Sequence, residues 1–136
     1  MTWKGWENFA GTLDERQVTG ERPKRSKYGA QPTVVDGVRF HSKKEADRYV
    51  ELKRLEGIGA VSGVELQPAF PLYVWDTVNK TATHIGKYVA DFRYVLHGPS
   101  GLLVDVVEDV KGFKTPVYRL KKKMVEAQYG VTIREI

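Results

Sequence analysis

Two acidic residues and a lysine stand together at the end of an apolar run, "LLVDVVEDVKGFK" over residues 102–114. The leucines and valines of this run are typical of a buried strand, whereas Glu108, Asp109 and Lys111 are residue types that can do chemistry. Side chains two apart share one face of a strand, so Asp109 and Lys111 point the same way and Glu108 points the other way. We therefore assign Asp109 to the site and expect Glu108 to have a supporting or a surface role.

A further carboxylate, Asp91, lies one predicted strand earlier within "YVADFRY". If the two strands are antiparallel neighbours, Asp91 and Asp109 can meet across the ladder, about 5 Å apart. Two carboxylates this close repel each other, and a lysine or a divalent cation offsets the repulsion. Mg²⁺ binds through one or two carboxylates with water and substrate phosphate, which suits phosphodiester hydrolysis. The simpler alternatives are a chance D-x-K at a strand end and an ordinary charge pair between Asp91 and Arg93.

Glu45 is the remaining candidate carboxylate, within "SKKEADRYVELKRLEGIG". This segment predicts a helix, with Ser42 as the N-cap and Glu45 at the third helical position. Glu45 falls on the same side of the helix as Tyr49 and Leu52, which should pack on a sheet. Capping of Ser42 and a role in the site both remain open for Glu45, and the two roles are compatible.

The elements that must position these residues follow from periodicity and turn signals. Short strands flank the turn Asp36-Gly37, which favours a hairpin. Three strands are predicted over residues 64–75, 84–96 and 102–110, as an antiparallel meander. A second helix follows, "TPVYRLKKKMVEAQYG", and then a closing strand, "VTIREI". The order helix, three strands, helix, strand predicts an α/β fold with a mixed sheet.

Two finer expectations concern which faces are apolar. In the strand over 84–96, Tyr88, Ala90, Phe92 and Tyr94 should share one face as core residues. In the second helix the predicted apolar stripe consists of Val117, Leu120, Met124 and Ala127. Residues 1–27 are predicted to be a separate arm with a basic linker, either a short amphipathic helix or a loosely ordered segment. The main domain is then residues 28–136.

The charge distribution favours a polyanionic partner. The chain has 136 residues and a formal net charge of +5. Residues 111–123 hold six Lys or Arg and no acid, and "RPKRSK" at 22–27 holds four more. A solvated face or a linker is the alternative for each cluster. The absence of cysteine excludes disulfides and thiolate metal sites. No apolar run is long enough to span a membrane, and the start lacks the apolar core of a secretory signal, so we expect a soluble intracellular protein.

Glu45, Asp91 and the tripeptide Asp109-Val110-Lys111, in this order, resemble the signature of the PD-(D/E)XK nuclease superfamily. The element order resembles its restriction-endonuclease-like α-β-β-β-α-β core, a mixed central sheet flanked by helices. Segments such as "DGVRFHSKKEADRYVELKRLE", "KYVADFRY" and "VEDVKGFKT" more closely resemble small bacteriophage-encoded endonucleases related to Holliday junction resolvases. The resemblance covers about residues 27–136. It departs from the signature at Ala90, where the family pattern has a proline.

The resemblance implies a DNA endonuclease that depends on Mg²⁺ or Mn²⁺. Asp91 and Asp109 would bind the metal, with the Val110 carbonyl as a further ligand. Lys111 would be the catalytic lysine and Glu45 an auxiliary ligand or water-holding residue, while Gln67 would line the site. From the charge clusters, the residues expected to contact DNA are Lys24, Arg25, Lys27, Lys114, Arg119, Lys122 and Lys123.

Kinship with junction-resolving enzymes predicts action on branched DNA in phage recombination, replication or packaging. Resolving a four-way junction takes two symmetric cuts, which predicts a homodimer. The protein would then work in the cytoplasm of a bacterial host. Two alternatives remain open: a nicking, repair or restriction-like nuclease, and a non-catalytic DNA-binding accessory protein.

Overall fold

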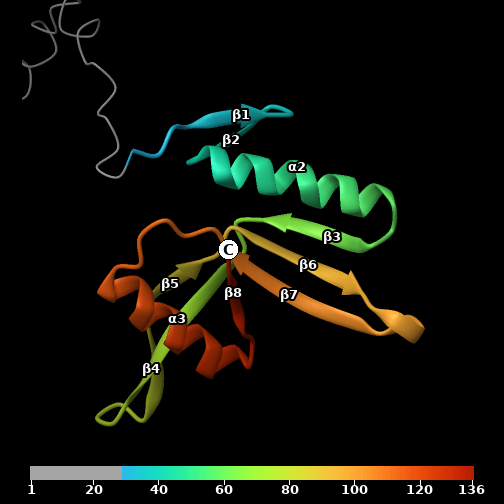
Figure 1. Ribbon diagram of the computed structural model, residues 1–136. Coiled ribbons are helices and arrows are strands. Elements are labelled where there is room, and N and C mark those ends of the chain that lie inside the picture. The colour runs from blue at the N-terminus through green and yellow to red at the C-terminus, as the bar shows by residue number, and fades with distance from the viewer. Residues whose placement is uncertain (1–28) are drawn as a thin grey trace, which may run out of the picture.

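A four-stranded mixed sheet forms the centre of the fold in the computed structural model, which describes residues 29–136 (Figure 1). Its strands are β3 (Val61–Leu66), β6 (Phe92–His97), β7 (Leu103–Asp109) and β8 (Ile133–Glu135), side by side in the order β3-β6-β7-β8. The pairs β3/β6 and β6/β7 are antiparallel and β7/β8 is parallel. The predicted α/β class with a mixed sheet is therefore confirmed.

Two of the predicted strands are each broken in the middle. The strand expected over 64–75 divides into β3 and β4 (Ala69–Asp76), and the strand over 84–96 divides into β5 (Thr81–Val89) and β6. Gln67 takes up a left-handed conformation with φ 51°, and Pro68 has no N–H to continue a ladder. The two breaks face each other, since Gln67 N donates to Asp91 O at 2.9 Å and Ala90 N to Pro68 O at 3.1 Å.

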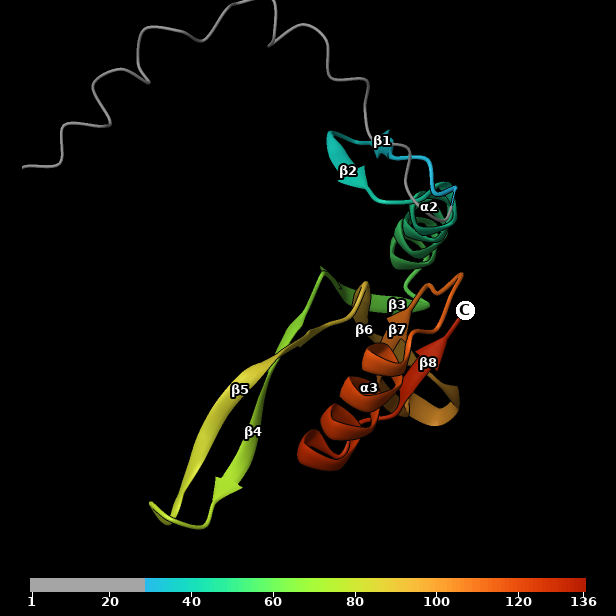
Figure 2. The same ribbon diagram turned by 90° about the vertical axis from the view of Figure 1, so that its left-hand side faces the viewer.

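Beyond these breaks, β4 and β5 form a separate two-stranded hairpin that extends away from the sheet (Figure 2). Tyr88, Ala90, Phe92 and Tyr94 are all buried, as expected of core residues, but the expectation that they share one face is wrong. Tyr88 and Ala90 belong to one apolar cluster, and Phe92 and Tyr94 belong to another. The reason is the bend at Ala90 and Asp91, which interrupts the alternation of side chains between β5 and β6.

Helix α2 (Lys43–Gly57) covers one face of the sheet. It begins at Ser42, whose side chain accepts from Glu45 N, as predicted. Ala46, Tyr49 and Leu52 bury its apolar side in a cluster with Phe92 and Tyr94. The hairpin of β1 (Thr33–Val35) and β2 (Val38–Phe40) packs against the helix. Its turn at Asp36 and Gly37 has φ of 50° and 77°, the conformation that the sequence favoured.

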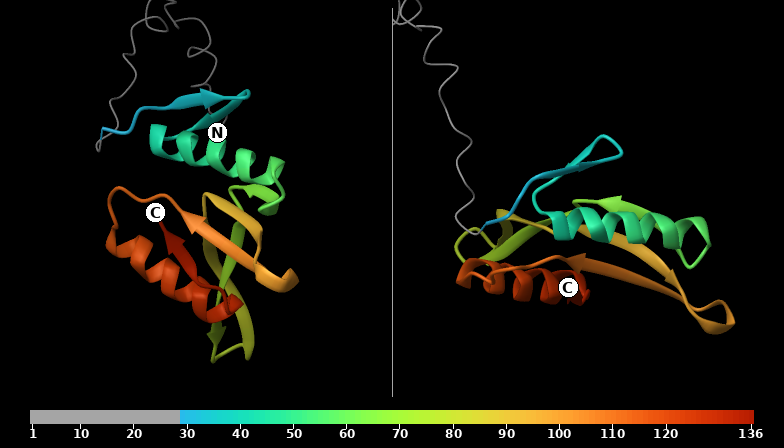
Figure 3. Two further views of the ribbon diagram at one scale, coloured as in Figure 1. Left: turned by 45° about the vertical axis from the view of Figure 1, so that its right-hand side comes forward. Right: turned by 45° about the horizontal axis from the view of Figure 1, so that its top comes forward.

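Helix α3 (Pro116–Tyr129) covers the opposite face (Figure 3). Thr115 caps its start and Gly130, with φ 64°, ends it. The predicted apolar stripe is only partly correct: Met124 packs against the core, whereas Val117 and Leu120 are 61% and 60% exposed and Ala127 is exposed as well. The helix is instead turned so that Val125 is buried with Tyr118 packed beside it.

Polar contacts explain this orientation of α3. Gln128 donates to Tyr73 O and accepts from Tyr73 N, both at 3.0 Å, and Tyr129 OH donates to Pro71 O at 2.7 Å. These contacts anchor the helix along β4. Between β6 and β7 lies a short 3₁₀ helix, η1 (Pro99–Gly101). Neither α2 nor α3, the helices of the described residues, has the length and apolarity needed to cross a membrane.

Candidate active site

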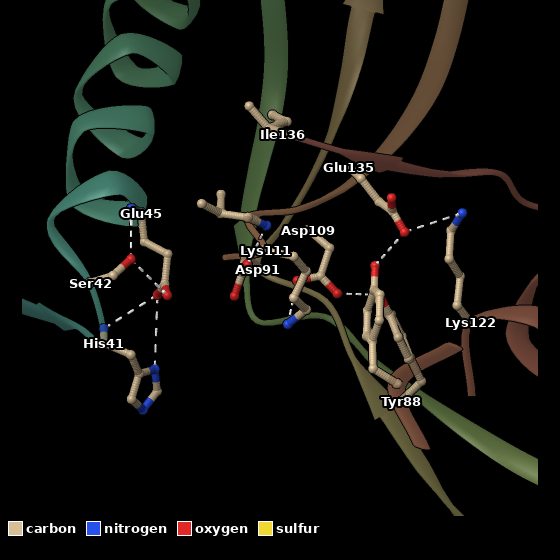
Figure 4. A network of polar contacts seen from close by, with 12 residues as sticks. His41, Ser42, Glu45, Tyr88, Asp91, Asp109, Lys111, Lys122, Glu135 and Ile136 are labelled. Atoms are coloured by element: carbon tan, nitrogen blue, oxygen red, sulfur yellow. Dashed lines mark hydrogen bonds and ion pairs between the residues drawn. The ribbon is translucent and has the colours of Figure 1, made fainter. Parts of the chain in front are cut away.

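Asp91 and Asp109 lie together where β6 begins and β7 ends (Figure 4). The antiparallel register pairs Phe92 with Glu108, so one further step places Asp91 opposite Asp109. Asp91 N donates to Glu108 O at 3.1 Å, and Val110 N donates to Asp91 Oδ2 at 2.7 Å. The break between β5 and β6 therefore sets Asp91 at a corner of the chain, beside the end of the next strand. The alternative pairing of Asp91 with Arg93 is wrong, because Arg93 binds the carboxylate of Asp105.

Asp109 is fully buried, and each of its carboxylate oxygens has a different environment. Oδ2 accepts a hydrogen bond from the Tyr88 hydroxyl. Oδ1 lies 2.7 Å from Lys111 Nζ, the partner that strand alternation predicts. This contact is an ion pair without hydrogen-bond geometry, and Oδ1 accepts no hydrogen bond from any of residues 29–136. One oxygen is thus fixed by Tyr88, and the other is held beside the positive charge of a lysine.

Burial and the neighbouring carboxylate alter the protonation of Asp91. Removal from water is the larger cause and contact with Asp109 the next, and together they raise the pKa of Asp91 to about 7. The charge of Glu45 acts in the same direction, whereas the hydrogen bond from Val110 N lowers the pKa. The site therefore concentrates negative charge that the chain itself compensates only in part.

Tyr88 is a residue of the site that the sequence had assigned to core packing. Burial, and then its hydrogen bond to Asp109, raise the pKa of Tyr88 well above the usual tyrosine range, so it acts as a hydrogen-bond donor. Tyr118 packs beside it, with ring centroids 6.2 Å apart, and Lys111 Nζ lies 5.0 Å from the centre of the Tyr118 ring. The one signal in the sequence was the hydroxyl itself, since a buried tyrosine usually needs a hydrogen-bond partner.

Glu45 fulfils the capping role that the sequence left open. Its Oε1 accepts from Ser42 Oγ at 3.1 Å and its Oε2 from His41 N at 3.3 Å. The same residue also lines a cavity of about 170 Å³ together with Gln67 and Asp91, and its carboxylate is seen across from the aspartates in Figure 4. Glu45 and Gln67 are therefore beside the site, with Glu45 held in place by its capping contacts.

The donor set fits a hard divalent cation at the aspartate pair. No group of three or more His, Cys, Asp or Glu side chains within residues 29–136 is spaced to hold a metal ion, so Glu45 does not complete a three-carboxylate cage. Mg²⁺ needs only one or two carboxylates, because water and substrate supply its other ligands. The buried, unsatisfied Oδ1 of Asp109 and the raised pKa of Asp91 are what such an ion would relieve.

Glu108 points to the other face of the sheet, as alternation predicts, but it is fully buried and the expectation of a surface position is wrong. Its carboxylate binds Arg48 in a bidentate pair, with Nε at 2.9 Å and Nη2 at 2.7 Å. Tyr94 OH also donates to it, and Arg134 Nη1 lies 3.6 Å away. Glu108 therefore holds α2 to the sheet and lies outside the aspartate site.

The residues predicted to contact DNA lie in different environments. Lys114 forms an ion pair with Glu135, and Lys122 lies 3.5 Å from both Glu126 and Glu135. Arg119 and Lys123 are exposed on α3. Lys24, Arg25 and Lys27 lie outside the described residues, as does the helix considered for residues 1–27.

Comparisons with known proteins place the chain in a family. No curated protein and no solved structure matches it. One family model matches residues 25–134, which is most of the chain and includes every residue of the site just described. The chain belongs to the family DUF1064, described as proteins of unknown function.

Proposed function

We propose that this protein is a metal-dependent DNA endonuclease that hydrolyses phosphodiester bonds, selective for branched DNA such as four-way junctions. The observation that carries the proposal is the meeting of Asp91 and Asp109 at adjacent strand ends, with Lys111 Nζ 2.7 Å from Asp109 Oδ1. The element order α2, β3, β6, β7, α3, β8, with β4 and β5 as an insertion, supports a restriction-endonuclease-like core.

Each residue then has a defined task. Asp91 and Asp109 would hold Mg²⁺ or Mn²⁺, with the Val110 carbonyl beside them, and the ion would supply charge neutralisation and a water of lowered pKa. Tyr88 fixes Oδ2 of Asp109 and so leaves Oδ1 facing the site. Lys111 is only partly buried, so its ammonium group can contact a phosphate oxygen and offset the charge that develops there. Glu45 and Gln67 shape the adjoining cavity.

Cleavage of a matched panel of DNAs tests this proposal. We expect a four-way junction to be cut with Mg²⁺ and not with EDTA, and linear duplex, flap and single strands of the same sequences to be cut less. D109N and K111A should lose at least about 100-fold in rate while DNA binding survives. D105N is the matched control, since Asp105 shares a face of β7 with Asp109 but is exposed and paired with Arg93.

The outcomes separate the alternatives. Cleavage by D109N at the wild-type rate, or no cleavage of any substrate with Mg²⁺ or Mn²⁺, would contradict the assignment. Equal cutting of junction and linear duplex would leave a general nuclease and remove the junction selectivity. Because two symmetric cuts need two active sites, we also expect a homodimer on the junction, measurable by sedimentation.

A further inference from the structure

A second cavity adjoins Asp109, on the side of α3. It measures about 390 Å³, more than twice the volume of the cavity lined by Glu45. Lys87 of β5, Lys121 of α3 and Lys111 all line it, together with Val89, Val117 and Asp109. We refer to it as the lysine groove. Asp109 borders the groove, whereas Glu45 and Asp91 line the other cavity, so the two aspartates face different cavities.

The charges of the groove are available to a ligand. No carboxylate of residues 29–136 forms an ion pair with Lys87 or Lys121. Lys121 Nζ instead donates to the backbone oxygen of Lys87 at 3.1 Å, and both residues line the groove. By contrast, the nearby Lys114 and Lys122 are occupied by Glu135 and Glu126.

The walls of the groove suit more than a simple anion. Val89 and Val117 are 39% and 61% exposed, and both line it. Two unpaired ammonium groups beside exposed apolar side chains match a nucleotide, which has a charged phosphate and less polar sugar surfaces. If the lysines were only a solvated surface cluster, there would be no reason for exposed valines to line the same groove.

We propose that the lysine groove binds the phosphate of a nucleotide adjacent to the cleaved bond, with its sugar against Val89 and Val117. Lys87 and Lys121 would contact this neighbouring phosphate, while Lys111 serves the phosphate at Asp91 and Asp109. The strand thus runs from the aspartate pair along the start of α3 and the base of the β4–β5 hairpin. This inference rests on the proposed function in taking the ligand to be a nucleic-acid strand.

Salt-dependent binding of a fluorescein-labelled twelve-residue oligothymidylate, measured by anisotropy in EDTA, tests the groove without cleavage. K87Q/K121Q should bind about tenfold more weakly at 0.15 M salt, and the slope of log K against log salt should fall by about 0.7 for each phosphate that the variant no longer neutralises. K87R/K121R, which keeps both charges, should stay near wild type. R54Q/K80Q is the matched control, since it removes the same number of positive charges from exposed positions outside the groove, at the end of α2 and the hairpin tip.

A second measurement does not depend on the variants. Acetylation of the wild-type protein with and without the oligonucleotide, read by mass spectrometry, should show protection of Lys87 and Lys121 but not of Lys80. Two results would refute the proposed role of the lysine groove. One is an equal loss of affinity in K87Q/K121Q and R54Q/K80Q, with no protection of Lys87 and Lys121 from acetylation. The other is the absence of any salt-dependent binding of the oligonucleotide. Cleavage of the junction alongside that result would leave the proposed function standing. If binding depended on Lys87 and Lys121 but no DNA were cleaved, the groove would be supported as a nucleotide-binding site and the proposed nuclease activity would be refuted.

Discussion

Glu108 and Asp109 are adjacent acids, both fully buried, and replacing each with its amide should have different consequences for stability. The Glu108 carboxylate meets Arg48 in two hydrogen bonds of 2.9 and 2.7 Å, and it also accepts from Tyr94. In E108Q an amide NH₂ would face the guanidinium donors of Arg48, and Arg48 would lose its buried counter-charge. The Arg48 side chain is only 15% exposed, so water cannot fully replace that partner.

The size of the effect follows from this geometry. Removing one partner of a buried ion pair costs about 3–5 kcal/mol, and the remaining contact of Arg48 with Glu51 at 2.6 Å reduces the expected loss to about 2–3 kcal/mol. D109N should behave differently, because it removes one of two adjacent like charges and the amide oxygen can still accept from Tyr88. It also removes the ion-pair partner of Lys111, but that side chain is 27% exposed and water can solvate its ammonium group. We expect its stability at pH 8 without divalent ions to be unchanged or up to about 1 kcal/mol higher.

Urea unfolding followed by circular dichroism, at pH 8 in EDTA, measures both variants. E108Q should lower the midpoint by about 1 M or more, since urea slopes are about 1–3 kcal/mol per M, whereas D109N should not lower it. E108D serves as a further control, because it keeps the charge and shortens the reach to Arg48. If D109N lost as much stability as E108Q, Asp109 would be a structural residue of the core, and its assignment to the site would be refuted.

Two further predictions concern the aspartate pair. Because the pKa of Asp91 is raised to about 7, protonation favours the folded state: the stabilisation is full below about pH 4 and is lost as the pH rises through about 7. The metal-free protein should be about 1–2 kcal/mol less stable at pH 8 than at pH 5, after allowing for solvent access to the Asp91 side chain. Urea unfolding at several pH values measures this dependence, and D91N should make the stability less dependent on pH. Y88F should weaken Mg²⁺ binding, measured by calorimetry, about tenfold or more, because Asp109 would lose the hydrogen bond that orients its carboxylate as a metal ligand. An unchanged Mg²⁺ affinity would show that Tyr88 does not contribute to the site.

The sequence was sufficient to predict the aspartate pair because its placement depends on local rules. Alternation of side chains along β7 predicts that Asp109 and Lys111 share a face and that Glu108 lies on the other. Antiparallel pairing of β6 with β7 then places Asp91 opposite Asp109. The bend beside Asp91 was not predictable in the same way. It depends on the left-handed Gln67, a residue type that rarely adopts φ above zero, and on hydrogen bonds between two segments far apart in the chain.

The orientation of α3 shows a different limit. Periodicity selected Val117 and Leu120 for the core, yet Tyr118 and Val125 face it. The pattern failed because contacts of Gln128 and Tyr129 with the backbone of β4 also fix the rotation of the helix. Lysine stems can cover apolar surface as well, so a run of lysines does not mark the exposed face of a helix.

The basic run over 111–123 illustrates why counting charges in a sequence does not show which lysines are available to a ligand. Lys114 and Lys122 are engaged by acids that lie after the run, so their charges are largely compensated. Lys121 joins Lys87, which lies 34 residues earlier on another element and was not a candidate at all. A lysine is available to a phosphate only where the fold leaves it without a carboxylate partner, and the sequence alone does not show where that is. On that criterion the groove at Asp109, rather than the outer surface of α3, is where the strand should lie.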